Sequence, residues 1–159
     1  PSGLAQELLS SAENLGIIHR IKWFDRIEND NMSQIYSMAA MSGGFNLVTS
    51  HCESFGMSVL ESLLSRCPVI CTNVGALSEL AEESDWFKMY NLGDAEKAIE
   101  IGLSMLDEFP PSRNGNLRNN LIQRFSSEKR SPEYWELLGK LTQENLQIRQ
   151  SFHQSISMD

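Results

Sequence analysis

Residues 45–72 read FNLVTSHCESFGMSVLESLLSRCPVICT, and this stretch decides the fold class. Residues 45–50 are rich in Phe, Val and Thr, which favour a β-strand. Residues 56–65 place apolar side chains on one half of a helical wheel and polar ones on the other, which predicts an amphipathic helix. Pro68 stops that helix and opens a second strand at residues 69–72. A strand, a helix and a further strand in succession predict a parallel βαβ unit.

The same alternation extends in both directions along the chain. Gly16 and Asp94 are typical of a helix C-terminus and a helix N-cap. The strands are expected at residues 17–24, 45–50, 69–72 and 86–90. The helices are expected at residues 5–14, 32–41, 56–65, 79–83, 95–108, 116–125 and 132–150. We therefore predict an α/β fold with a Rossmann-like, mostly parallel sheet and helices on both faces, in one domain over residues 1–150, followed by a tail over residues 151–159.

Composition and charge argue against several classes of function. The chain has 159 residues, of which 41% are hydrophobic and 21% are charged, which is typical of a globular domain. Its net charge of −8 argues against a nucleic-acid partner. No apolar run approaches the roughly 20 residues of a membrane span. Cys52, Cys67 and Cys71 lack the spacing of a disulfide framework or a zinc site, so we expect a reduced, cytoplasmic protein without a metal.

Two strand-to-helix turns are the candidate binding elements, because ligands of parallel sheets bind beyond the carboxyl ends of the strands. They are residues 50–56 and 73–78. Gly56 permits a close approach, and the helix that follows it offers free N–H groups and a partial positive charge to a diphosphate. Glu53 and Glu61 could accept hydrogen bonds from the hydroxyls at either end of a nucleotide sugar. From the periodicity alone, Glu61 is better explained as a solvated helix residue, and Glu53 could likewise be an ordinary acid of the first turn.

The segment ESFGMSVLESLLSRCPVICTNVGALSEL, residues 53–80, resembles the donor-site signature of the group 1 (family 4) retaining glycosyltransferases. That signature is a Glu, seven residues and a second Glu, with Phe-Gly between them. Two positions depart from it, since Arg66 and Ala76 stand where the family prefers glycine. The matching positions are Glu53, Phe55, Gly56, Glu61, Pro68, Val69, Gly75 and Glu79.

The resemblance implies the C-terminal half of the GT-B architecture and glycosyl transfer with retention from a nucleotide-diphosphate sugar. It implies that Glu53 contacts the transferred sugar as the catalytic residue and that Glu61 holds the ribose hydroxyls. It implies no cofactor and no metal. His51, close to Glu53, is a candidate further contact. The donor-binding residues implied are Ser54, Phe55, Gly56, Met57, Glu61, Gly75 and Ala76.

Other parts of the family pattern do not occur in these 159 residues. They are an upstream strand and helix that carry an Arg and a Lys against the diphosphate, and an N-terminal acceptor-binding domain. We therefore expect a fragment that is inactive by itself, with the missing N-terminal domain as its partner. A non-catalytic module that binds a nucleotide sugar or a partner is the alternative. An unrelated doubly wound domain, such as that of a sugar-nucleotide epimerase, is a third.

Overall fold

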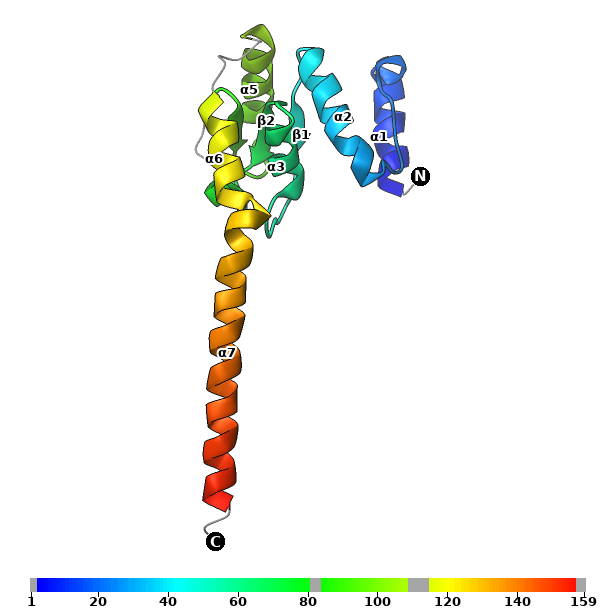
Figure 1. The fold of residues 1–159 in the computed structure, drawn as a ribbon. Helices are drawn as coiled ribbons and strands as arrows, with labels where there is room; N and C mark the ends of the chain where they lie inside the picture. The colour runs from blue at the N-terminus through cyan, green and yellow to red at the C-terminus, as the bar shows by residue number, and fades with distance from the viewer. Residues whose placement is uncertain (1–2, 81–83, 109–114, 157–159) are drawn as a thin grey trace.

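A three-stranded parallel sheet forms the centre of the molecule (Figure 1). The computed structural model describes residues 3–80, 84–108 and 115–156. The strands are β1 (Asn46–Val48), β2 (Val69–Thr72) and β3 (Phe87–Tyr90), and they lie in that order. Ile70 of β2 pairs with Leu47 on one side and Lys88 on the other. The predicted α/β class with a parallel, Rossmann-like sheet is confirmed.

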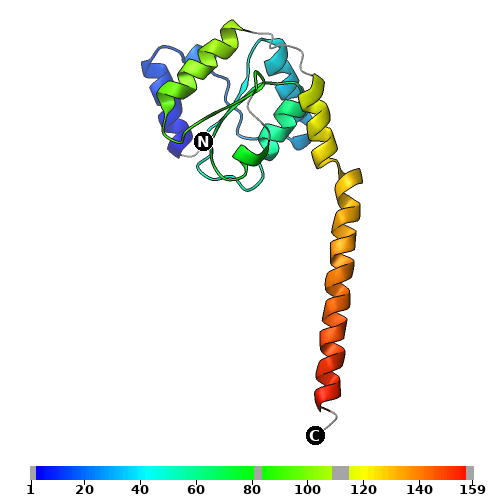
Figure 2. The same cartoon turned by 90° about the vertical axis from the view of Figure 1, so that its left-hand side faces the viewer.

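The central strand β2 is buried on both faces by helices. Val69 and Cys71 face the core beneath helix α3 (Met57–Leu64). Ile70, between them in the sequence, faces helix α5 (Ala95–Asp107), which packs on β2 and β3. A Cβ at Gly102 of α5 would lie 3.1 Å from the Phe45 Cζ atom, which is tight, so a glycine there lets the helix pack closely on the Phe45 ring beside β1. Figure 2 shows α3 and α5 on opposite sides of the sheet, as predicted.

The main core lies on the α3 side of the sheet. Helix α4 (Leu77–Leu80) and helix α6 (Gly115–Phe125) close it; α4 contributes the buried Leu77 and Leu80, and α6 contributes the buried Leu121. Burying a large aliphatic or aromatic side chain stabilises the fold by about 1.5–3 kcal/mol. The core residues are Val59, Leu60, Leu63, Val69, Cys71, Leu77, Leu80, Phe87 and Leu121.

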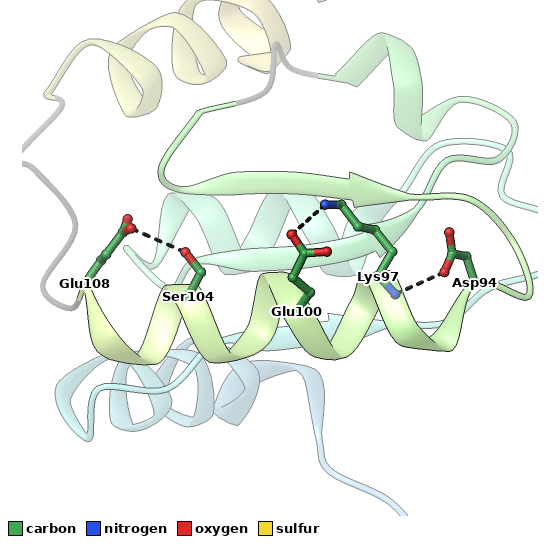
Figure 3. Close-up of polar contacts among 5 residues, drawn as sticks. All are labelled: Asp94, Lys97, Glu100, Ser104 and Glu108. Carbon is green, nitrogen blue, oxygen red and sulfur yellow. Dashed lines mark hydrogen bonds and ion pairs between the residues drawn. The ribbon is translucent and has the colours of Figure 1, made fainter.

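Helix α5 begins where its sequence predicts. The Asp94 carboxylate accepts a hydrogen bond of 3.0 Å from the Lys97 backbone N–H, which satisfies one free donor of the first turn. Along the exposed side, Lys97 pairs with Glu100 at 2.8 Å, and the Ser104 hydroxyl donates to Glu108 at 3.3 Å (Figure 3). Asp94 thus marks the start of the helix that follows β3 and covers the second face.

The predicted strand at residues 17–24 is wrong. The segment contains a short 3₁₀ helix, η1 (Ile18–Arg20), between helices α1 (Gly3–Asn14) and α2 (Asn29–Met41). A strand needs a neighbour for its N–H and C=O groups. No strand in the described part of the chain lies beside this segment, and its backbone bonds locally instead, with Arg20 N–H donating to the Ile17 carbonyl at 2.9 Å.

Most of the remaining helices and strands begin and end within three residues of the bounds predicted from the sequence. Helices α1 and α2 begin two and three residues earlier than predicted. The helix expected at residues 79–83 is α4, which begins at Leu77 and ends at Leu80; residues 81–83 lie outside the described residues, as do Pro110 and Pro111.

The last helix, α7 (Ser127–Ile156), is longer than predicted at both ends and extends away from the sheet (Figure 1). It begins five residues before Pro132 and continues six residues beyond Gln150, into the segment expected to be a tail. Arg130 N–H donates to the Ser126 carbonyl at 3.1 Å, so the first turn forms upstream of the proline. Pro132 lies inside the helix and lacks the N–H that would donate to the carbonyl four residues earlier, so one backbone bond of the helix is missing there. None of the helices described is long and apolar enough to cross a membrane.

Candidate functional site

The two turns predicted to bind a ligand lie in direct contact. Gly75 has a φ of 53°, and a Cβ there would overlap the Glu53 carbonyl oxygen, so only glycine fits. The next residue, Ala76, donates its backbone N–H to the same carbonyl at 3.0 Å. The turn after β2 is therefore locked onto the backbone of Glu53, in the turn after β1.

Hydrogen bonds between the strand ends support this lock. The buried Thr72 hydroxyl, at the end of β2, donates to the Ser50 carbonyl at 2.6 Å. Asn73 N–H donates to the Tyr90 carbonyl, at the end of β3, at 2.8 Å. Because all three strands are parallel, their carboxyl ends form one edge, where ligands of such sheets bind.

The N-terminus of α3 opens onto this edge. Gly56, its N-cap, has a φ of 85° and provides no side-chain cap. The first backbone bond of the helix runs from Leu60 N–H to the Gly56 carbonyl at 3.0 Å, and the first turn carries no acidic side chain. Free N–H groups and the helix dipole give this end a partial positive charge. Such an end suits an anion.

Glu53 lies at the rim of the same edge and is half-buried. Its backbone is held by Ala76, whereas its Oε1 atom lies 3.5 Å from the backbone nitrogen of Phe55. His51 and Ser54 are exposed beside it. The structure thus brings Glu53 together with the glycine turn and places a carboxylate next to the start of α3.

Glu61 lies in the second turn of α3 and is partly buried. The Glu61 side chain lies near the phenol of Tyr36 in α2, the helix that packs on α3. The neighbours of Glu53 are different residues, Phe55 and Ala76. Burial raises the pKa of Tyr36, and the Glu61 carboxylate and Cys67 raise it further. Glu61 is therefore not a freely solvated helix residue.

The two departures from the glycosyltransferase signature have different structural consequences. Arg66, just past α3, has a φ of 61°, the left-handed conformation in which glycine is favoured. Ala76 does not have a positive φ; among the described non-glycine residues, Arg66 alone has one. Replacement of the second glycine by Ala76 therefore leaves the turn intact.

Two residues of this region were missed by the sequence analysis. The ring of Phe125, the last residue of α6, contacts the ring of Phe55 edge to face, with centroids 5.6 Å apart. Arg124 places its guanidinium 5.1 Å from the Phe125 centroid and donates to the Leu80 carbonyl at 3.2 Å. No periodicity could reveal a pair of aromatic residues that are separated by seventy positions.

Metal-binding groups do not gather at this edge. Within the described residues, no three His, Cys, Asp or Glu side chains lie together in a way that could hold a metal ion. Independence from metals stays a prediction.

Comparisons with known proteins bear on the family to which the chain belongs. Residues 3–125 match the model of the family described as glycosyl transferases group 1. An N-acetyl-alpha-D-glucosaminyl L-malate synthase of Bacillus anthracis is 26% identical over 129 residues, which are 80% of this chain and 32% of that protein. A probable sucrose-phosphate synthase of Thermosipho melanesiensis is 24% identical over 109 residues, or 69% of this chain and 25% of the relative.

A D-inositol 3-phosphate glycosyltransferase of Corynebacterium diphtheriae is 31% identical over 80 residues, which are 48% of this chain and 18% of the relative. The chain thus spans about a third or less of the length of these relatives. The family model covers most of the chain, including β1, α3, β2 and both turns. The chain therefore belongs to the group 1 glycosyltransferases.

Proposed function

We propose that the edge where the two turns meet binds a nucleotide-diphosphate sugar, the donor of a retaining glycosyl transfer. The observation that carries the proposal is the lock between the turns, in which Gly75 abuts the Glu53 backbone and Ala76 N–H donates to its carbonyl at 3.0 Å. The lock places a carboxylate, a glycine that permits close approach and a helix N-terminus at one edge. Membership of the family supports this donor class.

Each part of the edge has a role that its chemistry suits. Amides at the start of α3, around Phe55, Gly56 and Met57, with Ser54 beside them, face the diphosphate. Glu53 accepts hydrogen bonds from the transferred sugar, with His51 next to it. The turn of Gly75 and Ala76 lies against the sugar or the phosphates.

Glu61 accepts hydrogen bonds from the ribose hydroxyls. Fixed dipoles that stabilise the leaving diphosphate supply much of the catalysis, without a metal.

In this proposal, glycosyl transfer requires protein segments in addition to these 159 residues. The chain spans 32% of the N-acetyl-alpha-D-glucosaminyl L-malate synthase and 25% of the probable sucrose-phosphate synthase. The resemblance assigns the Arg and Lys against the diphosphate, and the acceptor-binding half, to sequence outside this chain. We expect donor binding without glycosyl transfer by the isolated chain. Transfer by the purified 159 residues would contradict this division.

Calorimetric titration with UDP, GDP and ADP tests the donor site. One nucleotide is expected to bind saturably, and Glu61→Ala is expected to raise its Kd about tenfold or more, because a hydrogen bond to a charged group is lost. Glu100→Ala is the control, since Glu100 is an exposed acid of α5 that pairs with Lys97.

Equal binding by the wild-type chain and Glu61→Ala would remove Glu61 from the site. Failure of all three nucleotides to bind would overturn the proposal that this chain suffices for donor recognition.

A further inference from the structure

One aromatic contact joins the donor turn, defined here as residues 50–56, to the end of α6. The rings of Phe55 and Phe125 lie at an interplanar angle of 79°, with centroids 5.6 Å apart. Phe125 is partly buried and packs against the main core, whereas the Phe55 side chain is 43% exposed. The contact therefore ties an irregular surface turn to the core of the domain.

Phe125 is itself held by several groups. The Arg124 guanidinium lies 5.1 Å from its ring centroid and also donates to the Leu80 carbonyl at the end of α4. Arg130, in the first turn of α7, donates from Nε to the Arg124 carbonyl at 2.9 Å and pairs with Glu133 at 2.7 Å. The position of the Phe125 ring is thus set by the junction of α4, α6 and α7.

The donor turn depends on such a support, because among the described residues its first half bonds to the end of β2 and to the Gly75 turn, whereas residues 54–56 bond locally, to Glu53 and to Leu60 of α3. Ser50 and Glu53 accept hydrogen bonds from Thr72 and Ala76. Phe55 follows them, and its backbone nitrogen lies 3.5 Å from the Glu53 Oε1 atom. A shift of Phe55 would move both the Glu53 carboxylate and the amides that lead into α3. Edge-to-face aromatic pairs have a defined geometry that aliphatic contacts lack.

We propose that Phe125 is a positioning residue of the donor site: through the ring of Phe55 it holds the donor turn where Glu53 and the first amides of α3 meet the ligand. The identity of that ligand, a nucleotide-diphosphate sugar, rests on the proposed function. The mechanical part of the inference, that Phe125 orders the turn, rests on the contact itself.

The test measures binding and turn order separately on the whole 159-residue chain. The variants are Phe125→Leu, Phe55→Leu, the double variant and Phe125→Tyr, with Tyr134→Leu as control, because Tyr134 is an exposed aromatic of α7. Nucleotide binding is measured by calorimetry with UDP, GDP and ADP. Hydrogen exchange of the amides of residues 53–57 reports the order of the turn, and exchange of β2 reports global stability.

Loss of the edge-to-face pair is expected to change the nucleotide Kd and the exchange rate of residues 53–57 about three- to tenfold. Phe125→Leu raises the Kd and speeds exchange in residues 53–57 by that factor, and these amides still exchange faster than those of β2, which exchange only when the whole chain unfolds. Phe125→Tyr, which retains the ring, restores both values. The double variant is no worse than either single one, because both remove the same contact.

Three results would overturn the positioning role. They are wild-type exchange of the turn in Phe125→Leu, multiplicative effects of the two leucine substitutions, and exchange of the turn that is no faster than that of β2, which would mean that the turn opens only when the whole chain unfolds. If the wild-type chain binds none of the nucleotides, the proposed function fails for this chain, whereas hydrogen exchange still decides whether Phe125 orders the turn.

Discussion

At the scale of single residues, the most constrained position of the site is Gly75. Its Cα lies against the Glu53 backbone, and Ala76 N–H bonds to the Glu53 carbonyl at 3.0 Å. Glycine is therefore required twice, for its positive φ of 53° and for the space that a Cβ would occupy. Neither requirement depends on a bound ligand, so substitution should disturb the site even in the free protein.

We expect Gly75→Ala to lower the free energy of unfolding by about 2–4 kcal/mol, through backbone strain and steric overlap, and to abolish nucleotide binding. Gly93→Ala is the matched control. Gly93 has a φ of 87°, but a Cβ there meets nothing within 4 Å, so strain alone should cost about 1 kcal/mol. Urea unfolding and calorimetric titration of both variants check this. Equal losses in the two would mean that the close approach to Glu53 is unimportant.

At the scale of elements, helix α3 both covers the sheet and opens the site. Its apolar residues face the core, its N-terminus points to the edge where the turns meet, and Glu61 lies against α2. Its C-terminus is strained. Cys67 N–H donates to the Ser62 carbonyl at 2.9 Å and Arg66 N–H to the Leu63 carbonyl at 3.1 Å, the pattern of a glycine-type helix end, yet Arg66 occupies the left-handed position.

Arg66→Gly is therefore expected to stabilise the chain by about 0.5–1 kcal/mol, because removal of the left-handed strain exceeds the entropy that glycine adds to the unfolded state. The measurement is the midpoint of urea unfolding. Ser65→Gly is the control, because Ser65 has a φ of −83° and glycine there should destabilise. A shift of the same sign in both variants would contradict this account.

At the scale of the whole molecule, burial divides the three cysteines into two classes. Cys67 and Cys71 lie at 0% exposure on either side of Val69 and Ile70, whereas Cys52 is exposed in the donor turn. Burial also raises the pKa of the Cys67 thiol, which disfavours the reactive thiolate. Thiol reactivity therefore reports the integrity of the sheet and its helical cover.

One thiol per chain should react quickly with a disulfide reagent at neutral pH, and the other two should react only as the chain unfolds in urea. Absorbance of the released thiol reagent provides the measurement. Cys52→Ser is expected to remove the fast phase. Rapid reaction of two thiols in the native chain would mean that β2 is not covered on both faces.

The sequence by itself determined the elements whose signals are local. Strand β2 agrees at both ends, because an apolar run after Pro68 and a turn after Thr72 delimit it. Asp94 was predicted as a cap and is one, since capping depends on residues three positions apart. Two of the predicted site elements, the Glu53 turn and the Gly75 turn, were also found in contact, because parallel strands bring their carboxyl ends to one edge.

Only the tertiary structure decided the features that depend on distant neighbours. Residues 17–24 have the composition of a strand but, within the described residues, no strand to pair with, and a strand is stable only when its backbone groups find partners. Phe125 contacts Phe55 because α6 packs on α3, and that packing brings together residues seventy positions apart. Local patterns specify which residues can form a helix or a strand, but pairing and packing across the chain determine which of them meet.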